Sequence, residues 1–334
     1  MSGIRQFDEA RALVARHFTA TRLVRAGSLS TADANVHLKI ECDLPTGSFK
    51  VRGAVYSLTV NAARRDIKDV IAASTGNHGA AVAYAGRLLG IPATIFLPAN
   101  PNPVKAGRIR GLGARIVEGG DDLSVAIDAA YDYAARTNAF FLHDAADADV
   151  PCGTATIAME ILEQLPSTGA IYVPMGDTAL IRGVAAAAKQ LKPSVGIIGV
   201  VAERAPAYYE SWRTQTVVET ATADTIADGL AVRRALAPNV EAIRTLVEDV
   251  VMVTEEEMLD AIAWLMAKEG VTAEPSGAAT TAAFMKVRRT GSAQATAVKK
   301  PDATTVLLVT GCNIAPDVTA LLRGRMRRDR DRPL

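Results

Sequence analysis

The stretch "DVIAASTGNHGAAVAYAGRLLGIPATIFLP", residues 69–98, decides the fold class. A short apolar run with β-branched residues comes first, an alanine-rich run follows, and a second short apolar run ends the stretch. The middle run stops at Gly90 with Pro92 just beyond, which is typical of a helix end. The order is therefore strand, helix, strand, and two strands joined by a crossover helix run parallel. The stretch predicts an α/β fold.

The same alternation continues along the chain. Strand-like runs recur at 114–119 and 139–143, and the series restarts near residue 153 with a helix in "TATIAMEILEQL", a strand in "AIYVPM" and a helix in "ALIRGVAAAAKQL". Thr254 and Glu257 have the spacing of a capping box, and "TTVLLVTG" near the end predicts a buried strand. We therefore expect two α/β lobes, each with a mostly parallel sheet flanked by helices.

Length, charge and cysteine content exclude several classes of protein. A chain of 334 residues exceeds the size of a single core, which favours two lobes with a cleft. Because 37 Lys and Arg balance 36 Asp and Glu, neither nucleic acid nor an acidic membrane is an expected partner. Three widely spaced cysteines, Cys42, Cys152 and Cys312, suit a reducing, cytoplasmic location. No apolar run predicts an export signal or a membrane span.

The first of three candidate ligand sites is "LPTGSFKVRGA", residues 44–54. Thr46 or Ser48 can cap a helix that begins there, which puts Lys50 in its first turn. A cation at that end opposes the helix dipole. Together with burial, this placement should lower the pKa of Lys50 toward that of a usable nucleophile.

The second candidate is "ASTGNHG", residues 73–79, which follows a strand and opens a helix. Such a turn can hold a carboxylate on its backbone N–H groups, and Asn77 adds a side-chain donor. The alternative is an ordinary capped loop. His78 alone is more typical of a packed or capping histidine than of a catalytic one.

The third candidate is "VPMGDTALIRG", residues 173–183, where a strand leads into a helix at about Ala179. Gly176 allows close approach of the backbone, Thr178 offers a hydroxyl, and the helix supplies its dipole, as in a phosphate cradle. Asp177 is an anion beside the proposed phosphate. We therefore expect its carboxylate to point away or to accept backbone N–H bonds.

These motifs together resemble one family. The lysine of "TGSFKVRGA" is followed about 25 residues later by "STGNHG", and three further segments come in order: "IADGLAV" (226–232), "EPSGAA" (274–279) and "TGCN" (310–313). The chain resembles the fold-type II pyridoxal-phosphate enzymes, specifically the serine/threonine dehydratase-like group, over roughly residues 20 to 320. The resemblance implies a fold like that of tryptophan synthase β, with a large cofactor-binding domain (1–67 and 148–334), a small mobile domain (68–147) and a homodimer.

The resemblance also implies roles for individual residues. Lys50 would form the Schiff base with pyridoxal phosphate, Phe49 would lie against the ring, and Asn77 would bond the ring hydroxyl. The positions of the family's phosphate loop and of the group facing the pyridine nitrogen hold Gly176, Asp177, Thr178, Ala179 and Thr310. The substrate carboxylate would be held by Ser74, Thr75, Gly76, Asn77 and His78.

The activity implied is an ammonia-lyase (dehydratase). Lys50 would act as general base in β-elimination of water from serine, threonine or a relative such as hydroxyaspartate or phenylserine, which yields a 2-oxo acid and ammonia. A racemase of the same fold, with Thr75 as the acid on the second face, is an alternative. A cofactor-free binding pseudoenzyme is another, supported only by "GDTA" in the phosphate loop. A dinucleotide-binding oxidoreductase is disfavoured because no G-x-G-x-x-G follows a strand.

The chain departs from the family pattern at several positions. "GDTA" replaces a four-glycine loop and adds the carboxylate of Asp177. Cys152 stands in a segment that is usually glycine-rich, where a buried packing role is the simpler interpretation. Asp224 and Asp228 could brace a divalent cation, as near this segment in eukaryotic relatives, or be solvated loop carboxylates. Glu274 is expected to cap a helix or to lie near the cofactor ring.

Overall fold

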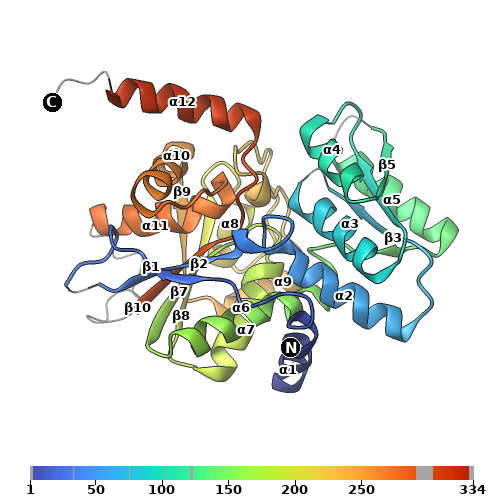
Figure 1. Cartoon of the computed structure of the whole chain (residues 1–334), viewed down its shortest axis with the longest axis horizontal. Helices are drawn as coiled ribbons and strands as arrows, with labels where there is room; N and C mark the ends of the chain where they lie inside the picture. Colours follow the sequence, from blue (N-terminus) through green and yellow to red (C-terminus); the bar gives the residue numbers. More distant parts are fainter. Residues whose placement is uncertain are drawn as a thin grey trace.

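A computed structural model describes residues 3–32, 34–74, 76–101, 103–120, 123–290 and 304–330 (Figure 1). The strands are β1 (Leu23–Arg25), β2 (Val36–Ile40), β3 (Val70–Ala73), β4 (Ala93–Leu97), β5 (Arg115–Glu118), β6 (Phe140–Phe141), β7 (Thr168–Pro174), β8 (Gly196–Ala202), β9 (Asp249–Val253) and β10 (Thr304–Val309). The α-helices are α1 (Ile4–Val14), α2 (Lys50–Arg64), α3 (Asn77–Leu89), α4 (Pro103–Gly111), α5 (Leu123–Thr137), α6 (Val150–Gln164), α7 (Ala179–Leu191), α8 (Ala207–Thr214), α9 (Ala237–Leu246), α10 (Glu255–Trp264), α11 (Pro275–Thr290) and α12 (Pro316–Arg330). Short helical turns are η1 (Glu41–Asp43), η2 (Asp228–Leu230) and the π-helical η3 (Leu265–Glu269).

The larger sheet has the strand order β1-β2-β10-β7-β8-β9. Its pairs are parallel, except that β1 runs antiparallel to β2. Alternate residues of β7 face two different clusters: Ile171 and Val173 pack with α6 and α7, whereas Ala170 and Tyr172 pack with α10 and α11. Because helices cover both faces, these strands are apolar throughout rather than alternating with polar residues.

The smaller sheet has the order β5-β4-β3-β6, and its pairs are parallel. All its strands lie between residues 70 and 141, and α3 and α5 pack against β3 and β4. It forms the part of the molecule on the right of Figure 1, next to α2. The predicted α/β fold with two parallel sheets is confirmed. The division into domains at 67 and 147, and the mobility of the smaller part, stay predictions.

Two predicted helix signals are confirmed. Gly90 ends α3 in the left-handed region with φ of 69°. Thr254 caps α10 reciprocally: Glu257 N donates to Thr254 Oγ1 at 3.1 Å, and Thr254 N donates to Glu257 Oε2 at 3.0 Å. Local signals of this kind depend only on neighbouring residues, so the sequence is sufficient to place them.

The predicted cap of α2 is wrong. The helix does begin at Lys50, but Phe49 occupies the cap position in helical conformation. The hydroxyls of Thr46 and Ser48 are buried and have no hydrogen-bond partner among the described residues. The chain enters α2 alongside the end of β10 instead, where Phe49 N donates to Thr310 O at 3.0 Å. Contact with a distant strand therefore replaces the local cap.

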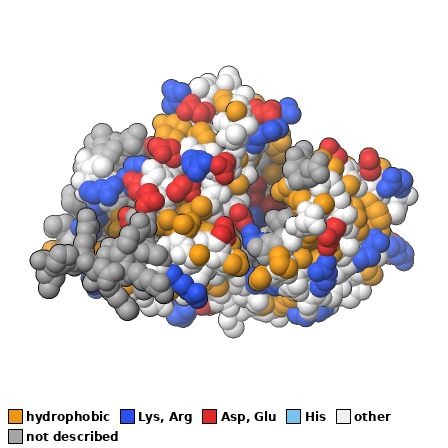
Figure 2. Space-filling view, turned by 90° about the horizontal axis from the view of Figure 1, so that it is seen from above, with side chains coloured by type: hydrophobic (Ala, Val, Ile, Leu, Met, Phe, Trp, Pro, Cys, Tyr) orange, Lys and Arg blue, Asp and Glu red, His pale blue; other side chains and the backbone are white. Residues whose placement is uncertain are grey.

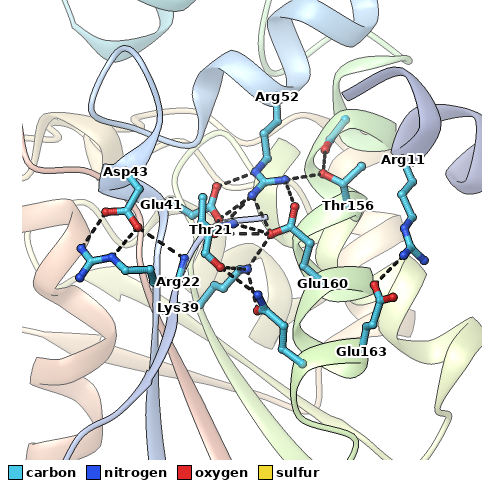
Figure 3. A network of polar contacts seen from close by, with 12 residues as sticks. Arg11, Thr21, Arg22, Lys39, Glu41, Asp43, Arg52, Thr156, Glu160 and Glu163 are labelled. Carbon is cyan, nitrogen blue, oxygen red and sulfur yellow. Dashed lines mark hydrogen bonds and ion pairs between the residues drawn. The ribbon is translucent and has the colours of Figure 1, made fainter. Parts of the chain in front are cut away.

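A buried polar network fixes α2 from the side away from the cavity (Figure 3). The Arg52 guanidinium is fully buried and binds Glu41 Oε2 at 2.7 Å and Glu160 Oε1 at 2.6 Å. Lys39 Nζ reaches the second Glu160 oxygen at 2.6 Å, and Thr156 Oγ1 accepts from Arg52 at 3.0 Å. These bonds tie β2, α2 and α6 together two residues after Lys50. No helix in the described ranges is long and apolar enough to cross a membrane.

Candidate active site

A cavity of about 890 Å³ lies where the carboxyl ends of β3, β7 and β10 face one another. Figure 2 shows the surface hollowed between the part that carries the smaller sheet and the rest of the molecule. Most of the predicted site residues line this cavity: Phe49, Lys50, Ser74, Gly76, Asn77, His78, Gly176, Asp177, Thr178, Asp228 and Thr310. The structure therefore brings together the three junctions at which a ligand was expected.

Three predicted site residues stand apart from that set. Ala179 is buried as the first residue of α7 and takes part through its backbone N–H. Asp224 lies on the exposed surface and pairs with Arg204. Thr75, predicted as a catalytic and substrate-binding residue, lies outside the described residues, so its role stays a prediction.

Lys50 is held between two carboxylates. Its Nζ donates to Asp144 Oδ2 at 2.9 Å and also to Asp177 Oδ2. The Phe49 ring lies beside it, with the amine 5.3 Å from the ring centroid. Burial lowers the pKa of Lys50, but the charges of Asp144 and Asp177 outweigh it, so the pKa is raised above its ordinary value. The predicted lowering is thus wrong for this state, in which Lys50 is an ammonium group.

Asp144 is a site residue that the sequence prediction missed. It follows β6 directly after His143, and its side chain is mostly buried. Burial disfavours its charged form, yet the neighbouring His78 and Lys50 hold the pKa of Asp144 well below its usual range. The available signal was a carboxylate just past a strand end in "AFFLHD". The carboxyl ends of parallel strands are where such a group reaches a ligand.

The loop from Gly176 to Ala179 leads β7 into α7, as predicted. A Cβ atom on Gly176 would lie 1.9 Å from the carbonyl oxygen of Gly229, so only glycine fits there. Thr178 adopts a left-handed φ of 72°, a conformation that glycine tolerates better. Asp177 Oδ1 accepts the Ala179 N–H at 2.8 Å, which confirms that this carboxylate would accept a backbone bond. An acidic side chain thus occupies part of the anion site at the start of α7.

Asn77, Asn313 and Glu274 form a second polar group at the cavity. Asn77 Nδ2 donates to Glu274 Oε1 at 2.7 Å, and Asn313 Nδ2 donates to Asn77 Oδ1 at 2.6 Å. Asn313 N donates to the other Glu274 oxygen at 3.1 Å. Burial raises the pKa of the Glu274 carboxyl to about 7, although the bonds from Asn77 and Asn313 act against it. This carboxyl can therefore gain or lose a proton near neutral pH.

The remaining residues of the loop before α3 are also held in place. Gly76 N donates to Ser74 Oγ at 3.3 Å. The His78 Nε2 donates to the carbonyl of Leu142 at 2.8 Å, and the other ring nitrogen lies 3.8 Å from Asp144 Oδ2. His78 is buried, as expected for a packed histidine, but it also lies against the carboxylate that binds Lys50.

A model of the pyridoxal-phosphate dependent enzyme family matches residues 14–311, which is most of the chain. The chain belongs to this family. It is 35% identical to the L-threonine ammonia-lyase of Thermotoga maritima over 286 residues, which cover 85% of this chain and 71% of that protein. The L-threonine ammonia-lyase of Geobacter sulfurreducens is 37% identical over 76% of this chain and 63% of its own length. The predicted membership of the serine/threonine dehydratase-like, fold-type II group is confirmed.

Solved structures of the family superpose closely on this one. Maize serine racemase matches with a TM-score of 0.89 and 28% identity, covering 99% of each chain. A bacterial-type match, a solved threonine deaminase, has a TM-score of 0.84 and 28% identity, covering 93% of this chain and 98% of that one. The protein is a pyridoxal-phosphate-dependent lyase with the fold of these enzymes.

The residues present fit pyridoxal phosphate. The cavity offers an amine at Lys50, the N-terminus of α7 for the phosphate, and buried hydroxyls at Ser48 and Thr178 that lack a partner in the described part of the chain. Such unpartnered polar atoms cost free energy unless a ligand binds them. Thr310 would provide a hydroxyl for the ring nitrogen, as the resemblance implies.

A divalent cation has no support from the described residues. Asp228 pairs with Lys105, and Asp224 pairs with Arg204. Within the described ranges no group of three His, Cys, Asp or Glu side chains could hold a metal ion. The two carboxylates match the alternative interpretation, exposed loop residues paired with surface cations.

Two further residues were singled out only in part. Asn313 belongs to the quoted "TGCN" motif, but its contact with Asn77 depends on the approach of two segments 236 residues apart. Cys152 is fully buried within the main core, as the simpler interpretation expected. Glu274 combines both predicted roles, since its carbonyl accepts from Ala278 N at 2.9 Å while its carboxyl faces the cavity.

Proposed function

We propose that this protein is an ammonia-lyase that removes water from a small 3-hydroxy amino acid and releases a 2-oxo acid and ammonia. The observation that carries the proposal is the position of Lys50, whose amine lies in the cavity between the predicted phosphate loop and the loop before α3. Support also comes from relatives named L-threonine ammonia-lyase and L-threonine dehydratase. Threonine is accordingly the first substrate to test.

The chain's own residues divide the work. Bound pyridoxal phosphate supplies an electron sink that makes the Cα proton of an amino acid acidic. Ser74, Gly76 and Asn77 would bind the substrate carboxylate at the start of α3. Lys50 would take the Cα proton, for which it must first lose a proton and at least one of its two carboxylate contacts, because an ammonium group has no lone pair.

Asp144 and Asp177 are suited to control that proton. Both contact Lys50 Nζ, so either can accept its proton once a ligand changes the local charge. Thr178 would bind the phosphate through its hydroxyl, together with the N-terminus of α7. The cavity is large enough for a side chain bigger than that of threonine, so hydroxyaspartate and phenylserine remain within the proposed substrate class.

The test is a panel of L-serine, L-threonine, 3-hydroxyaspartate and 3-phenylserine, with 2-oxo acid and ammonia measured together. We expect release from at least one member, and none from Lys50→Ala at equal cofactor content. Exchange of the Cα hydrogen for deuterium with inversion and without 2-oxo acid would instead identify a racemase. No reaction with any member would contradict dehydration. We also expect a homodimer, which light scattering would test.

A further inference from the structure

Two cysteines meet next to the cavity without being part of it. Ile40 and Val309 are paired residues of the neighbouring strands β2 and β10, and Cys42 and Cys312 follow them closely in the chain. Their thiols interact directly. Both side chains are partly exposed, whereas Cys152 is buried. Strand pairing therefore places two thiols within reach of each other at the end of the larger sheet.

The two thiols differ in chemistry. Cys42 donates to Cys312, and this bond lowers the pKa of the Cys312 thiol to about 7, with a further contribution from the Arg108 guanidinium. Burial and the carboxylate of Asp43 act in the opposite direction. The same interaction raises the pKa of Cys42 above its ordinary value. Near neutral pH a large fraction of Cys312 is therefore thiolate beside a protonated thiol, the arrangement of a reactive cysteine with a resolving partner.

We propose that Cys42 and Cys312 form a reversible disulfide when hydrogen peroxide reaches this edge of the sheet, and that the disulfide weakens cofactor binding. The Cys312 thiolate attacks one peroxide oxygen, the O–O bond breaks, and a sulfenic acid and hydroxide form. The Cys42 sulfur then attacks the Cys312 sulfur, the S–O bond breaks, and the hydroxyl leaves as water with the Cys42 proton. Two thiols are oxidised and one peroxide becomes two waters. A dithiol reverses the reaction.

The position of Cys312 connects the disulfide with the cavity. Cys312 N donates to Gly47 O at 3.0 Å, and its Sγ lies 3.6 Å from the same oxygen. The next residue, Asn313, donates to both Asn77 and Glu274. The space is tight, because a Cβ on Gly47 would lie 3.1 Å from Cys312 Sγ. Drawing Cys312 toward Cys42 therefore displaces the segment that orients Asn77.

The experiment uses the full-length protein, reduced or treated with equimolar hydrogen peroxide. Peptide mapping without reductant should show Cys42 linked to Cys312 with the loss of two hydrogens, and Cys152 unlinked. Cys42→Ser should stop at a sulfenic acid that dimedone traps on Cys312, whereas Cys312→Ser should give no dimedone adduct at position 42. Failure to find the linked peptide, or dimedone labelling of Cys42 in Cys312→Ser, would overturn the assignment.

The effect on the cofactor is measured separately by titration with pyridoxal phosphate. We expect the oxidised protein to bind about tenfold more weakly, as loss of one hydrogen bond of ~1.4 kcal/mol would cause, and dithiothreitol to restore binding. The Cys42→Ser variant without peroxide should bind as the reduced protein does. Equal affinity of the oxidised and reduced proteins would refute the coupling. Because none of these readouts depends on turnover, they stand apart from any failure of the proposed dehydratase activity.

Discussion

Two cations on α2 have similar partners and opposite surroundings. Lys50 lies between Asp144 and Asp177 and lines the cavity, while Arg52 lies between Glu41 and Glu160 away from it. Residues two apart on a helix point in different directions, so one turn presents a cation to each side. The same charge pattern therefore serves two purposes in one short segment.

The difference lies in how completely each cation is satisfied. Arg52 donates to two carboxylates and to the hydroxyls of Thr21 and Thr156, all in the interior. Nothing in that network faces the cavity, so it stabilises the fold and holds the start of α2. Lys50 instead binds carboxylates from the segments that follow β6 and β7, at the cavity, where an incoming ligand can replace them. A buried pair fixes geometry, and a cavity pair can exchange partners.

Replacing Arg52 with alanine should have the largest effect on stability. It leaves Glu41 and Glu160 buried without their guanidinium partner, and removing one member of a buried pair costs about 3–5 kcal/mol. Urea denaturation of the cofactor-free protein measures the change in the free energy of unfolding. A loss below about 1 kcal/mol would show that the network does not hold α2.

Glu274 should give stability a pH dependence of its own, because its cavity partners Asn77 and Asn313 carry no charge. Its pKa is raised from an ordinary 4.5 to about 7, so the folded protein binds this proton more tightly than the unfolded chain does. The contribution is fully present below about pH 4.5 and is lost as the pH rises through about 7, by ~3 kcal/mol in total. Glu274→Gln should flatten this part of the curve of unfolding free energy against pH. An unchanged slope would rule out Glu274 as its source.

Asp177→Asn should change cofactor uptake by a smaller amount. Since Asp144 and Asp177 together raise the pKa of Lys50, removal of one charge should lower it and leave more free amine at neutral pH. The midpoint of the rate of pyridoxal-phosphate uptake against pH should fall by about one unit, which is ~1.4 kcal/mol. Stopped-flow absorbance measures this rate. Asp144→Asn is the matched control and should shift the midpoint in the same direction, so a rise with either variant contradicts the account.

The smallest effect is expected at the surface. Arg11 and Glu163 pair at 2.6 Å, but both side chains are about half exposed. Exposed pairs of this kind contribute roughly 0–1 kcal/mol. Arg11→Ala, measured by the same denaturation as Arg52→Ala, should therefore change stability by less than about 1 kcal/mol. A cost equal to that of Arg52→Ala would remove burial as the explanation of the difference.

Much of the fold and part of the site could be predicted from the sequence. Strand and helix periodicity, the end of α3 at Gly90 and the capping box of α10 depend on neighbouring residues. The place of Lys50 in the first turn of α2 and the start of α7 at Ala179 follow from the same local signals. The resemblance supplied the family, which the comparisons confirm.

The chemistry of Lys50 could not be predicted in this way. Its partners Asp144 and Asp177 lie 94 and 127 residues away in the chain, so the direction of its pKa shift depends on tertiary contacts. The expected caps by Thr46 and Ser48 failed for the same reason, because the end of β10 lies where they would act. Local signals place the elements, whereas packing decides the charge at their ends.

The central claim is that Lys50 is the amine that holds pyridoxal phosphate. Borohydride reduction of the loaded protein, followed by peptide mapping by mass spectrometry, tests it directly. The account predicts a phosphopyridoxyl group on the peptide that contains Lys50 and its absence from Lys50→Arg, which keeps the charge. A label on another lysine, or none on a protein that has bound the cofactor, would contradict it.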